Sequence, residues 1–402
     1  MGTHMFGSRK AGEEMVVCAN PECPEQRFPA KDLLFICPGR PCPGLAKTRE
    51  SIKPKQKERY PDQFLFRAER FAYSVPCPFS PHTAFVKVCP HCWARQPAAT
   101  GQTSTIAVIG SSFSGKTCYI TALIRQIEEE LARRASFRMA LHWDDQDGFN
   151  YFDRQRRHIF DEGVLPDQTH KNVPVRSLQI TIRFPVHGLL RGLRVGSQGV
   201  VSLVFPDPSG EVLQSLEDAY FLHTLFRAQA LILMVDPFGS PKYLQRLKAG
   251  GQDVESFRTL YSADRALDVF ITNWRRQANQ RHGKIPKDLA VVLTKCDDEG
   301  VFDPDDERYG GFPVQAPPYS RRLFEEISRR VEQHLELELR MPKIGTMANE
   351  NFRNVGFFAA SALGKPPTAV EEKGVRILRI DDPKPRRVEE PLLWILHKWG
   401  YW

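Results

Sequence analysis

A glycine-rich loop between an apolar run and a helix-forming stretch constrains the fold of this chain more than any other feature. Residues 110–117 read Gly-Ser-Ser-Phe-Ser-Gly-Lys-Thr and fit the pattern G-x-x-x-x-G-K-[ST] at every fixed position. An apolar run at 106–109 precedes the loop, and a stretch typical of a helix follows at 118–134. A strand, a glycine loop and a helix in this order are the context that a phosphate-binding loop requires.

The loop residues have separate predicted roles. Backbone N–H groups of the loop are expected to surround a β-phosphate at a helix N-terminus, where the helix dipole also favours an anion. Lys116 is expected to neutralise the β- and γ-phosphates and is the first candidate catalytic residue, and Thr117 is expected to coordinate Mg²⁺. The alternative is a chance glycine turn before a helix, which the three motifs that follow in order disfavour. The candidate nucleotide-binding residues here are Gly110, Ser111, Ser112, Phe113, Ser114, Gly115, Lys116, Thr117 and Cys118.

An acidic turn, Asp207-Pro208-Ser209-Gly210, follows the β-rich run 200–205. Asp207 is expected to reach the Mg²⁺ shell through water. The N–H of Gly210 is expected to bond a γ-phosphate, and this bond disappears when that phosphate leaves. The alternative is an ordinary Asx-type turn after a strand.

A third motif, Thr294-Lys295-Cys296-Asp297, follows the apolar run 289–293. Asp297 is expected to accept hydrogen bonds from the N1–H and the exocyclic amine of guanine. Adenine has an acceptor at N1 and lacks that amine, so it is rejected. Lys295 is expected to lay its aliphatic stem along the base. A plain surface turn is the alternative, but the position after the first two motifs predicts guanine recognition, with Thr294 in the same loop.

A fourth segment, Ala360-Ser361-Ala362-Leu363, follows the run 355–358 and is a candidate base-contacting loop. Leu363 stands where such loops usually carry lysine. Only Ser361 and backbone contacts, including those of Ala362, are therefore expected to reach the base.

These motifs resemble those of the TRAFAC class of P-loop GTPases, and more closely those of the bacterial double-GTPase families of conflict-system operons. The resemblance covers about residues 103–402. It implies GTP binding and hydrolysis, and action beside partner proteins in defence against phage or plasmids. The supporting stretches are Gly210-Glu211, Val235-Asp236-Pro237, the late Pro-Leu-Leu-Trp at 391–394, and Leu-Pro-Asp-Gln-Thr at 165–169, which resembles the first switch segment.

Two further candidate catalytic residues follow from this resemblance. Thr169 is the candidate first-switch threonine, which would coordinate Mg²⁺ and contact the γ-phosphate. Glu211 stands where many relatives carry glutamine, and an ionised carboxylate can only accept hydrogen bonds. Glu211 either orients the attacking water or caps a helix, so intrinsic hydrolysis is expected to be slow. An arginine from a partner adds about 10³ to 10⁵ in rate in such systems, and Arg154, Arg156 and Arg157 either serve in cis or form a solvated helix face.

The cysteines are distributed very unevenly, with seven of the nine before residue 93. Disulfides need an oxidising compartment, which a P-loop protein is not expected to enter. Four pairs of soft or borderline ligands predict two tetrahedral zinc sites. The spacings are Cys18-x4-Cys23, Cys37-x4-Cys42, Cys77-x4-His82 and Cys89-x2-Cys92.

The assignment of these pairs to ions is open. We expect the first two pairs to share one ion and the last two the other; a crossed arrangement and ligation by His91 in place of His82 are the alternatives. Free thiols in a small core are the alternative to metal. The region has few apolar residues, so we expect it not to fold without metal. Zinc modules often bind nucleic acid or protein, and the basic run 53–59 could face phosphates, although a solvated loop is the favoured interpretation.

Alternating apolar runs and helical stretches predict an α/β fold, a P-loop GTPase domain with a mainly parallel sheet and helices on both faces. A small zinc-ribbon-like domain precedes it. The antiparallel pair is expected to join 177–184 to 199–205. Expected strands are 105–109, 177–184, 199–205, 229–235, 288–293 and 355–360. Expected helices are 117–135, 150–161, 212–226, 254–280, 320–338 and 388–399.

The expected organisation is a tag remnant and flexible N-terminus (1–15), a zinc-binding domain (16–97), a linker (98–104) and the GTPase domain (105–402). Extra length near 135–175, 237–285 and 298–319 is expected to form partner surfaces or lids, or inert decoration.

The formal net charge of +8 is modest for 402 residues, so nucleic-acid binding is possible but not favoured. No apolar run approaches the roughly 20 residues that span a bilayer, and no secretory leader is recognised. We therefore expect a cytoplasmic protein that binds GTP or GDP, Mg²⁺ and two Zn²⁺. Its expected partners are a second GTPase, an effector or a second copy of itself. The alternatives are a weakly catalytic pseudo-GTPase scaffold and a nucleic-acid-binding zinc module regulated by GTP.

Overall fold

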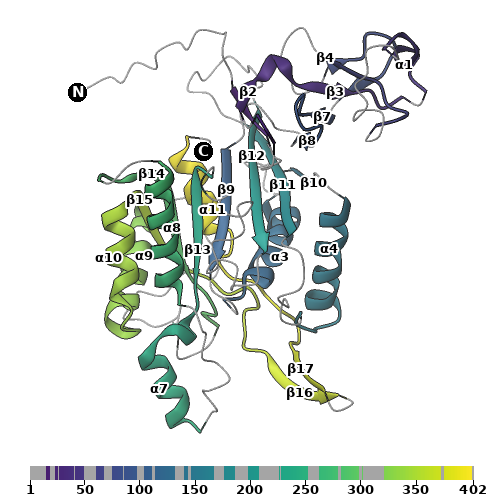
Figure 1. The fold of residues 1–402 in the computed structure, drawn as a ribbon. Coiled ribbons are helices and arrows are strands. Elements are labelled where there is room, and N and C mark those ends of the chain that lie inside the picture. The colour runs from purple at the N-terminus through teal and green to yellow at the C-terminus, as the bar shows by residue number, and fades with distance from the viewer. Residues whose placement is uncertain are drawn as a thin grey trace. The chain divides into compact units, whose positions relative to one another are not determined.

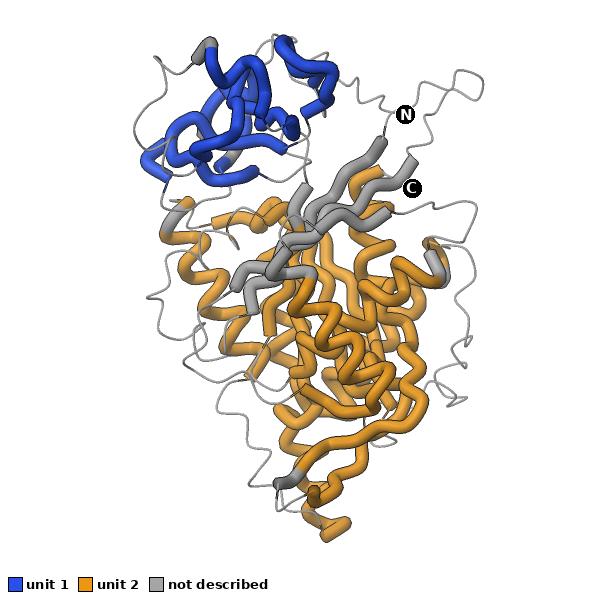
Figure 2. Tube along the Cα trace, turned by 90° about the vertical axis from the view of Figure 1, so that its right-hand side faces the viewer, with its two compact units in different colours: residues 1–103 blue, residues 104–402 orange. Residues whose placement is uncertain are grey.

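The chain forms two compact units, residues 1–103 and residues 104–402, in a computed structural model (Figure 2). The structure describes residues 15–18, 23–25, 27–39, 41–48, 60–67, 75–84, 86–96, 104–110, 114–131, 140–143, 146–166, 176–185, 198–207, 226, 228–251, 262–278, 282–297, 301, 321–372 and 375–400.

A seven-stranded sheet forms the centre of the larger unit, in the order β10-β11-β12-β9-β13-β14-β15. Strands β12, β9, β13, β14 and β15 run parallel, whereas β10 and β11 are antiparallel to their neighbours. The predicted parallel sheet and its antiparallel pair are confirmed; β10 was not predicted. The strands are β9 (Ser104–Gly110), β10 (Ala140–Trp143), β11 (Arg176–Pro185), β12 (Gln198–Asp207), β13 (Ala230–Val235), β14 (Ile285–Leu293) and β15 (Phe352–Ala359).

Both faces of this sheet are covered by helices (Figure 1). Successive side chains of a strand point to opposite faces, so Ile232 and Met234 join one apolar cluster, and Leu231 and Leu233 join the other. Strands buried on both faces read as continuous apolar runs, which is why β13 is recognisable in the sequence. On one face lie α3 (Lys116–Gln126), α4 (Gln146–Arg156) and α11 (Glu390–Lys398), and on the other lie α8 (Ala263–Gln277) and α10 (Pro342–Asn351).

Two further helices, α9 and α7, belong to the larger unit. Helix α9 (Arg321–Gln333) packs along β15 and contributes to both clusters. Helix α7 (Pro241–Ala249) was not predicted, although Ser240 caps it by accepting from the Tyr243 N–H at 3.1 Å and a proline follows the cap. Most of the expected helix 212–226 lies outside the described residues. In the described part of the chain, no helix is both long and apolar enough to cross a lipid bilayer.

A hairpin of β16 (Thr368–Glu372) and β17 (Val375–Arg379) follows the candidate base loop and was not predicted. Its second strand and the residue that follows it make backbone bonds with the start of the expected first-switch segment and with the residues just before it. Leu165 N donates to Leu378 O at 3.0 Å, and Ile380 N donates to Gly163 O at 2.8 Å. The hairpin therefore fixes the start of that segment.

The smaller unit is built from short strands around buried cysteines. One sheet has the order β4-β3-β7-β8, and two further strand pairs are antiparallel. Cysteine side chains belong to its apolar clusters together with Phe28, Phe35 and Phe64. The elements are β1 (Met15–Val17), β2 (Arg27–Pro29), β3 (Leu34–Ile36), α1 (Pro43–Thr48), β4 (Leu65–Arg67), β5 (Val75–Pro76), β6 (Thr83–Ala84), β7 (Val86–Val88) and β8 (Arg95–Gln96).

Replacing Gly163 by alanine tests the attachment of the hairpin. Gly163 has a φ of +65°, and an added Cβ would fall well inside the contact distance of the Ile380 carbonyl oxygen. We expect Gly163→Ala to destabilise the protein by about 2–4 kcal/mol, measured as a lower melting temperature. Gly251→Ala is the matched control, because Gly251 has a φ of +79° with nothing within 4 Å, and it should cost only about 1–2 kcal/mol. Equal effects of the two variants would contradict the close approach.

Candidate nucleotide site and cysteine groups

The carboxyl ends of four neighbouring parallel strands, β9, β13, β14 and β15, coincide in register. Gly110 pairs with Met234, Val235 with Leu293, and Leu293 with Ala359. The glycine loop, the Asp297 loop and the candidate base loop therefore all leave the sheet at one edge. Ligands of open α/β sheets bind at this edge.

The glycine loop closes tightly on itself. Lys116, 9% exposed, directs its Nζ into the loop and donates to the carbonyl oxygen of Gly110 at 3.1 Å. A Cβ on Gly110 would lie 2.7 Å from Ser114 Oγ and 2.8 Å from Met234 Cβ, so this position needs glycine. Gly115 has a φ of +79° immediately before α3, a conformation that glycine adopts without strain. Residues 111–113 lie outside the described residues.

The Asp297 loop is fastened to the strands on both sides. Thr294 donates to the Val235 carbonyl from its backbone N at 3.0 Å and from its hydroxyl at 3.1 Å. On the other side, Cys296 N donates to Ala360 O at 3.3 Å. The Ser361 hydroxyl donates to Asp297 Oδ1, so the two predicted base-contacting residues lie together.

The base loop is held by its own contacts, and these explain its missing lysine. Ser361 and Arg386 exchange two backbone bonds of 3.0 and 2.8 Å. Leu363, 8% exposed, packs with Ile159 and Ile380 in a small apolar cluster. A lysine at 363 would place its charge in that cluster, so leucine there serves packing.

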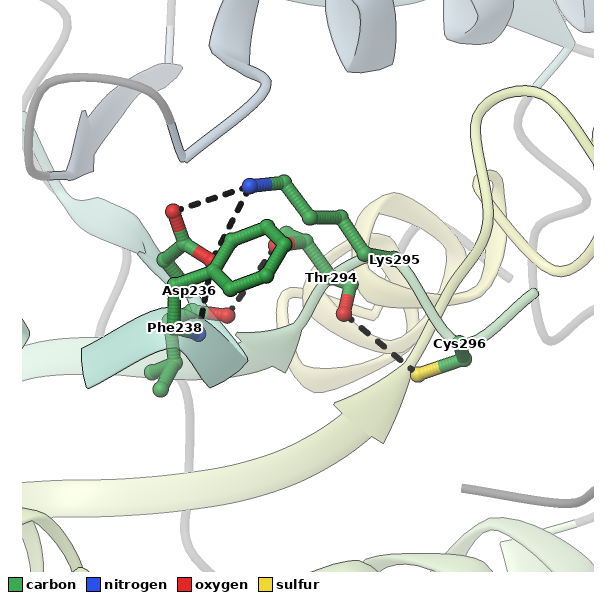
Figure 3. A network of polar contacts seen from close by, with 6 residues as sticks. Asp236, Phe238, Thr294, Lys295 and Cys296 are labelled. Carbon is green, nitrogen blue, oxygen red and sulfur yellow. Dashed lines mark hydrogen bonds and ion pairs between the residues drawn. The ribbon is translucent and has the colours of Figure 1, made fainter. Parts of the chain in front are cut away.

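Lys295 makes contacts that the sequence did not reveal (Figure 3). Its Nζ donates to both carboxylate oxygens of Asp236, at 3.1 and 3.0 Å, and lies 4.1 Å from the centroid of the Phe238 ring. Burial raises the pKa of the Asp236 carboxyl above its ordinary value, although Lys295 acts to lower it. The available signal was positional, because Asp236 and Lys295 follow neighbouring buried strands.

Two cysteines of these motifs, Cys118 in α3 and Cys296 in the Asp297 loop, have raised thiol pKa values. Burial raises the pKa of Cys118 to about 11 and also raises that of Cys296. Both therefore stay protonated at neutral pH, and neither has the lowered pKa of a nucleophile.

Several predicted residues cannot be placed. Thr169, Gly210 and Glu211 lie outside the described residues, and only the backbone of Asp207 is described. Asp207 is the last residue of β12. Strand β12 pairs with β9 as far as Val204 and Ala107. These two residues lie three positions before Asp207 and Gly110, the last residues of their strands.

The cis-arginine alternative gains no support from the geometry. Arg156 and Arg157 both bond Asp153 along the same helix, and Arg154 is exposed. These contacts favour the solvated helix face.

The cysteines of the smaller unit gather in two groups, and their pairing corrects our expectation. The first two pairs do not share a group; the crossed arrangement holds instead. Within each group all Sγ atoms lie within 4.8 Å of one another. One group is Cys18, Cys23, Cys89 and Cys92, and the other is Cys37, Cys42 and Cys77.

The sulfur distances fit a tetrahedral zinc site. Zinc–thiolate bonds of about 2.3 Å imply sulfur separations of about 3.8 Å, and Cys23–Cys89 and Cys42–Cys77 both measure 3.7 Å. A hydrogen bond with Cys18 is the main cause that lowers the pKa of Cys89 to about 5, whereas burial raises that of Cys23 to about 11. The sulfur separations and the clustering of the thiols fit a zinc ion, so both groups could hold zinc.

His82 lies beside the second group but outside it. Its Nδ1 is 3.1 Å from Ser80 Oγ, which in turn is 3.3 Å from Cys37 Sγ. A Cβ on Gly39 would come within 2.7 Å of that Nδ1, so the imidazole fits only beside a glycine. The alternative ligand, His91, lies next to the first group, where it pairs with Glu25 at 3.2 Å.

Comparisons with known proteins agree with the loop arrangement. A protein-family model described as Double-GTPase 2 matches residues 104–340. Among curated proteins, none is significantly similar in sequence.

Two solved structures are distantly similar. One is the signal recognition particle receptor SRb-GTP/SRX complex from Chaetomium thermophilum, at 11% identity and TM-score 0.27, covering 66% of this chain and 93% of that chain. The other is the GTP-bound GTPase-like domain of S. cerevisiae Ski7, at 12% identity and TM-score 0.30, covering 74% of this chain and 50% of that chain.

Assignment rests on the family model. Its match covers more than half of the 402 residues and includes the glycine loop, both strands that flank β9, and the Asp297 loop. The chain therefore belongs to the Double-GTPase 2 family of P-loop GTPases.

Proposed function

We propose that this protein binds GTP with Mg²⁺, hydrolyses it, and uses the nucleotide state to switch its affinity for a partner protein. One observation carries the proposal. The loops that carry Lys116 and Asp297 leave the sheet at the same edge, from β9 and β14, the two strands that flank β13. Lys116 has the chemistry to bind phosphate, and Asp297 has the chemistry to bind guanine.

Different residues bind the phosphates, the Mg²⁺ ion and the base. Lys116 balances the phosphate charge, and Thr117, half-buried at the start of α3, offers a hydroxyl of the donor class that Mg²⁺ prefers. Asp297 accepts from guanine, while Ser361 holds its carboxylate in place. Thr169 and Asp207 complete the proposed Mg²⁺ ligands. Glu211 is the proposed neighbour of the attacking water, so turnover is slow without a stimulating partner.

Family membership supports the biological part of the proposal. Double-GTPases act beside other proteins, so the partner is a second GTPase or an effector of a bacterial defence system, in the cytoplasm. The hairpin β16–β17 supports a switch, because it bonds the segment before Thr169 and also follows the base loop.

The smaller unit is proposed to hold two zinc ions. Cys18, Cys23, Cys89 and Cys92 form the first site. The second combines Cys37, Cys42 and Cys77 with His82, whose imidazole replaces Ser80 beside the thiolates. Zinc in such sites supplies folding free energy.

Lys116→Ala tests the enzyme and the switch together. The variant loses the charge that faces the phosphates, so we expect phosphate release from GTP to fall to background, about hundredfold or more. Capture of a partner by GTP-analogue-loaded protein over GDP-loaded protein should vanish with it. Lys242→Ala, which breaks an exposed pair with Glu338, is the control and should match the wild type. Equal phosphate release by wild type and Lys116→Ala would remove the enzyme claim.

Asp297→Asn tests guanine recognition. An amide donates where the carboxylate accepted, so GTP affinity should fall about hundredfold or more, while xanthosine triphosphate, with a carbonyl in place of the amine, should bind better than GTP. Titration calorimetry with both nucleotides measures the exchange. Unchanged GTP affinity would show that another residue reads the base.

His82→Ala tests the second zinc site. After dialysis against a mild chelator, the wild type should retain two zinc ions and His82→Ala about one, measured by elemental analysis. His91→Ala is the matched control and should retain two. In the Co²⁺-substituted protein, the thiolate charge-transfer band should change on His82→Ala alone. Full zinc retention and an unchanged spectrum would remove His82 from the ligands.

A further inference from the structure

A buried carboxylate, that of Asp236, contacts the lysine of the base-reading loop (Figure 3). Asp236 follows β13 directly and is 2% exposed. Its Oδ1 accepts from the Phe238 N–H at 3.0 Å, and both oxygens accept from Lys295 Nζ. The charge of Lys116 also reaches this carboxyl electrostatically.

Stability does not explain this carboxylate. Burial raises its pKa, and that effect exceeds the opposing effects of Lys295, the Phe238 N–H and Lys116. A raised folded-state pKa means that folding favours the protonated form, so the ionised carboxylate lowers stability as pH rises above its ordinary pKa. Buried ion pairs are often replaceable by neutral groups without loss of stability.

Phosphate binding does not explain it either. A negative charge near Lys116 opposes the approach of phosphates, because it competes for the same positive charge. Its direct contacts point instead to Lys295 and to the base-reading half of the site.

Lys295 has an unusual backbone conformation. Its φ is +56°, in the left-handed region that non-glycine residues seldom adopt. The long side chain would otherwise sample many rotamers. Asp236 and the Phe238 ring hold the ammonium at one place. These contacts fix the aliphatic stem of Lys295 before a base binds.

Asp236 and Lys295 are also joined through the residues that precede them. Thr294 is bonded to the Val235 carbonyl by its backbone and its hydroxyl. Val235, directly before Asp236, thus holds Thr294, directly before Lys295. Asp297 follows two residues after Lys295 in the same loop.

We propose that Asp236 is a positioning residue for guanine recognition, which fixes Lys295 in advance so that its stem covers the base read by Asp297. Phe238 acts as the second support of the lysine. The inference rests on the proposed function, since it requires a guanine nucleotide at Asp297. Preorganisation of this kind strengthens binding because less freedom is lost when the ligand enters.

Asp236→Asn is the primary test, because asparagine has the same shape and keeps an oxygen for the Phe238 N–H. GTP and GDP affinities should fall alike by about tenfold to thirtyfold, the cost of ordering one lysine side chain. Maximal turnover at saturating GTP should stay unchanged while KM rises. Tripolyphosphate, which has no base, should bind no more weakly than to the wild type. In a Lys295→Met background, adding Asp236→Asn should have no further effect.

Controls separate this inference from the rest. Glu338→Gln removes the carboxylate of the exposed pair with Lys242, at 2.8 Å, and should leave every affinity unchanged. A wild type without GTP affinity would overturn the proposed function itself, before any variant is measured. Unchanged GTP affinity in Asp236→Asn, an equal loss for tripolyphosphate, or an additive loss with Lys295→Met would overturn the positioning role. If Asp236→Asn does not fold, Lys295→Met alone must lose GTP affinity and keep tripolyphosphate affinity; failure of either overturns the inference.

Discussion

The aligned carboxyl ends of β9, β13, β14 and β15 are the constraint on which the larger unit depends. Parallel strands in one register must release their chains at one edge. Gly110, Asp236, Thr294 and Ala360 therefore begin their loops side by side, although they are spread over 250 positions of the sequence. The apolar side chains that alternate between the two faces fix this register, since a slip of one residue would turn each strand over. Core packing thus determines the site geometry.

The parts that could be predicted from sequence are those with a local physical signal. The glycine loop has a fixed spacing, and β13 and β14 are buried on both faces, so their apolar runs stand out. The cysteine pairing could not be predicted, because Cys23 meets Cys89 across 66 positions and each pair has the same chemistry. Leu363 was recognised as a departure from the usual lysine, but its reason lies in Ile159 and Ile380, which only the fold brings to it. Helix α7 did have a local signal, the serine cap followed by proline, which the surrounding charged residues obscured.

The candidate site combines backbone conformations and charges that are unfavourable in a folded protein. Gly115 and Lys295 have positive φ, and Asp236 is a buried carboxylate with a raised pKa. Such features persist only where surrounding structure holds them. Here the sheet does so, since the strand residues directly before them, from β13 and β14, are fully buried. A rigid apolar sheet is therefore the condition for a strained and charged edge.

The smaller unit has a different kind of core. Its strands are short, and its apolar clusters include the thiols themselves, with Cys18 and Cys89 in one and Cys37, Cys42 and Cys77 in another. Thiolates that lie within 4.8 Å of one another repel unless a cation or shared protons neutralise them. A metal ion would remove that repulsion and would join segments that are far apart in sequence. The grouping of Cys18 and Cys23 with Cys89 and Cys92 brings the residues that follow the first described strand, β1, to the turn before the last, β8.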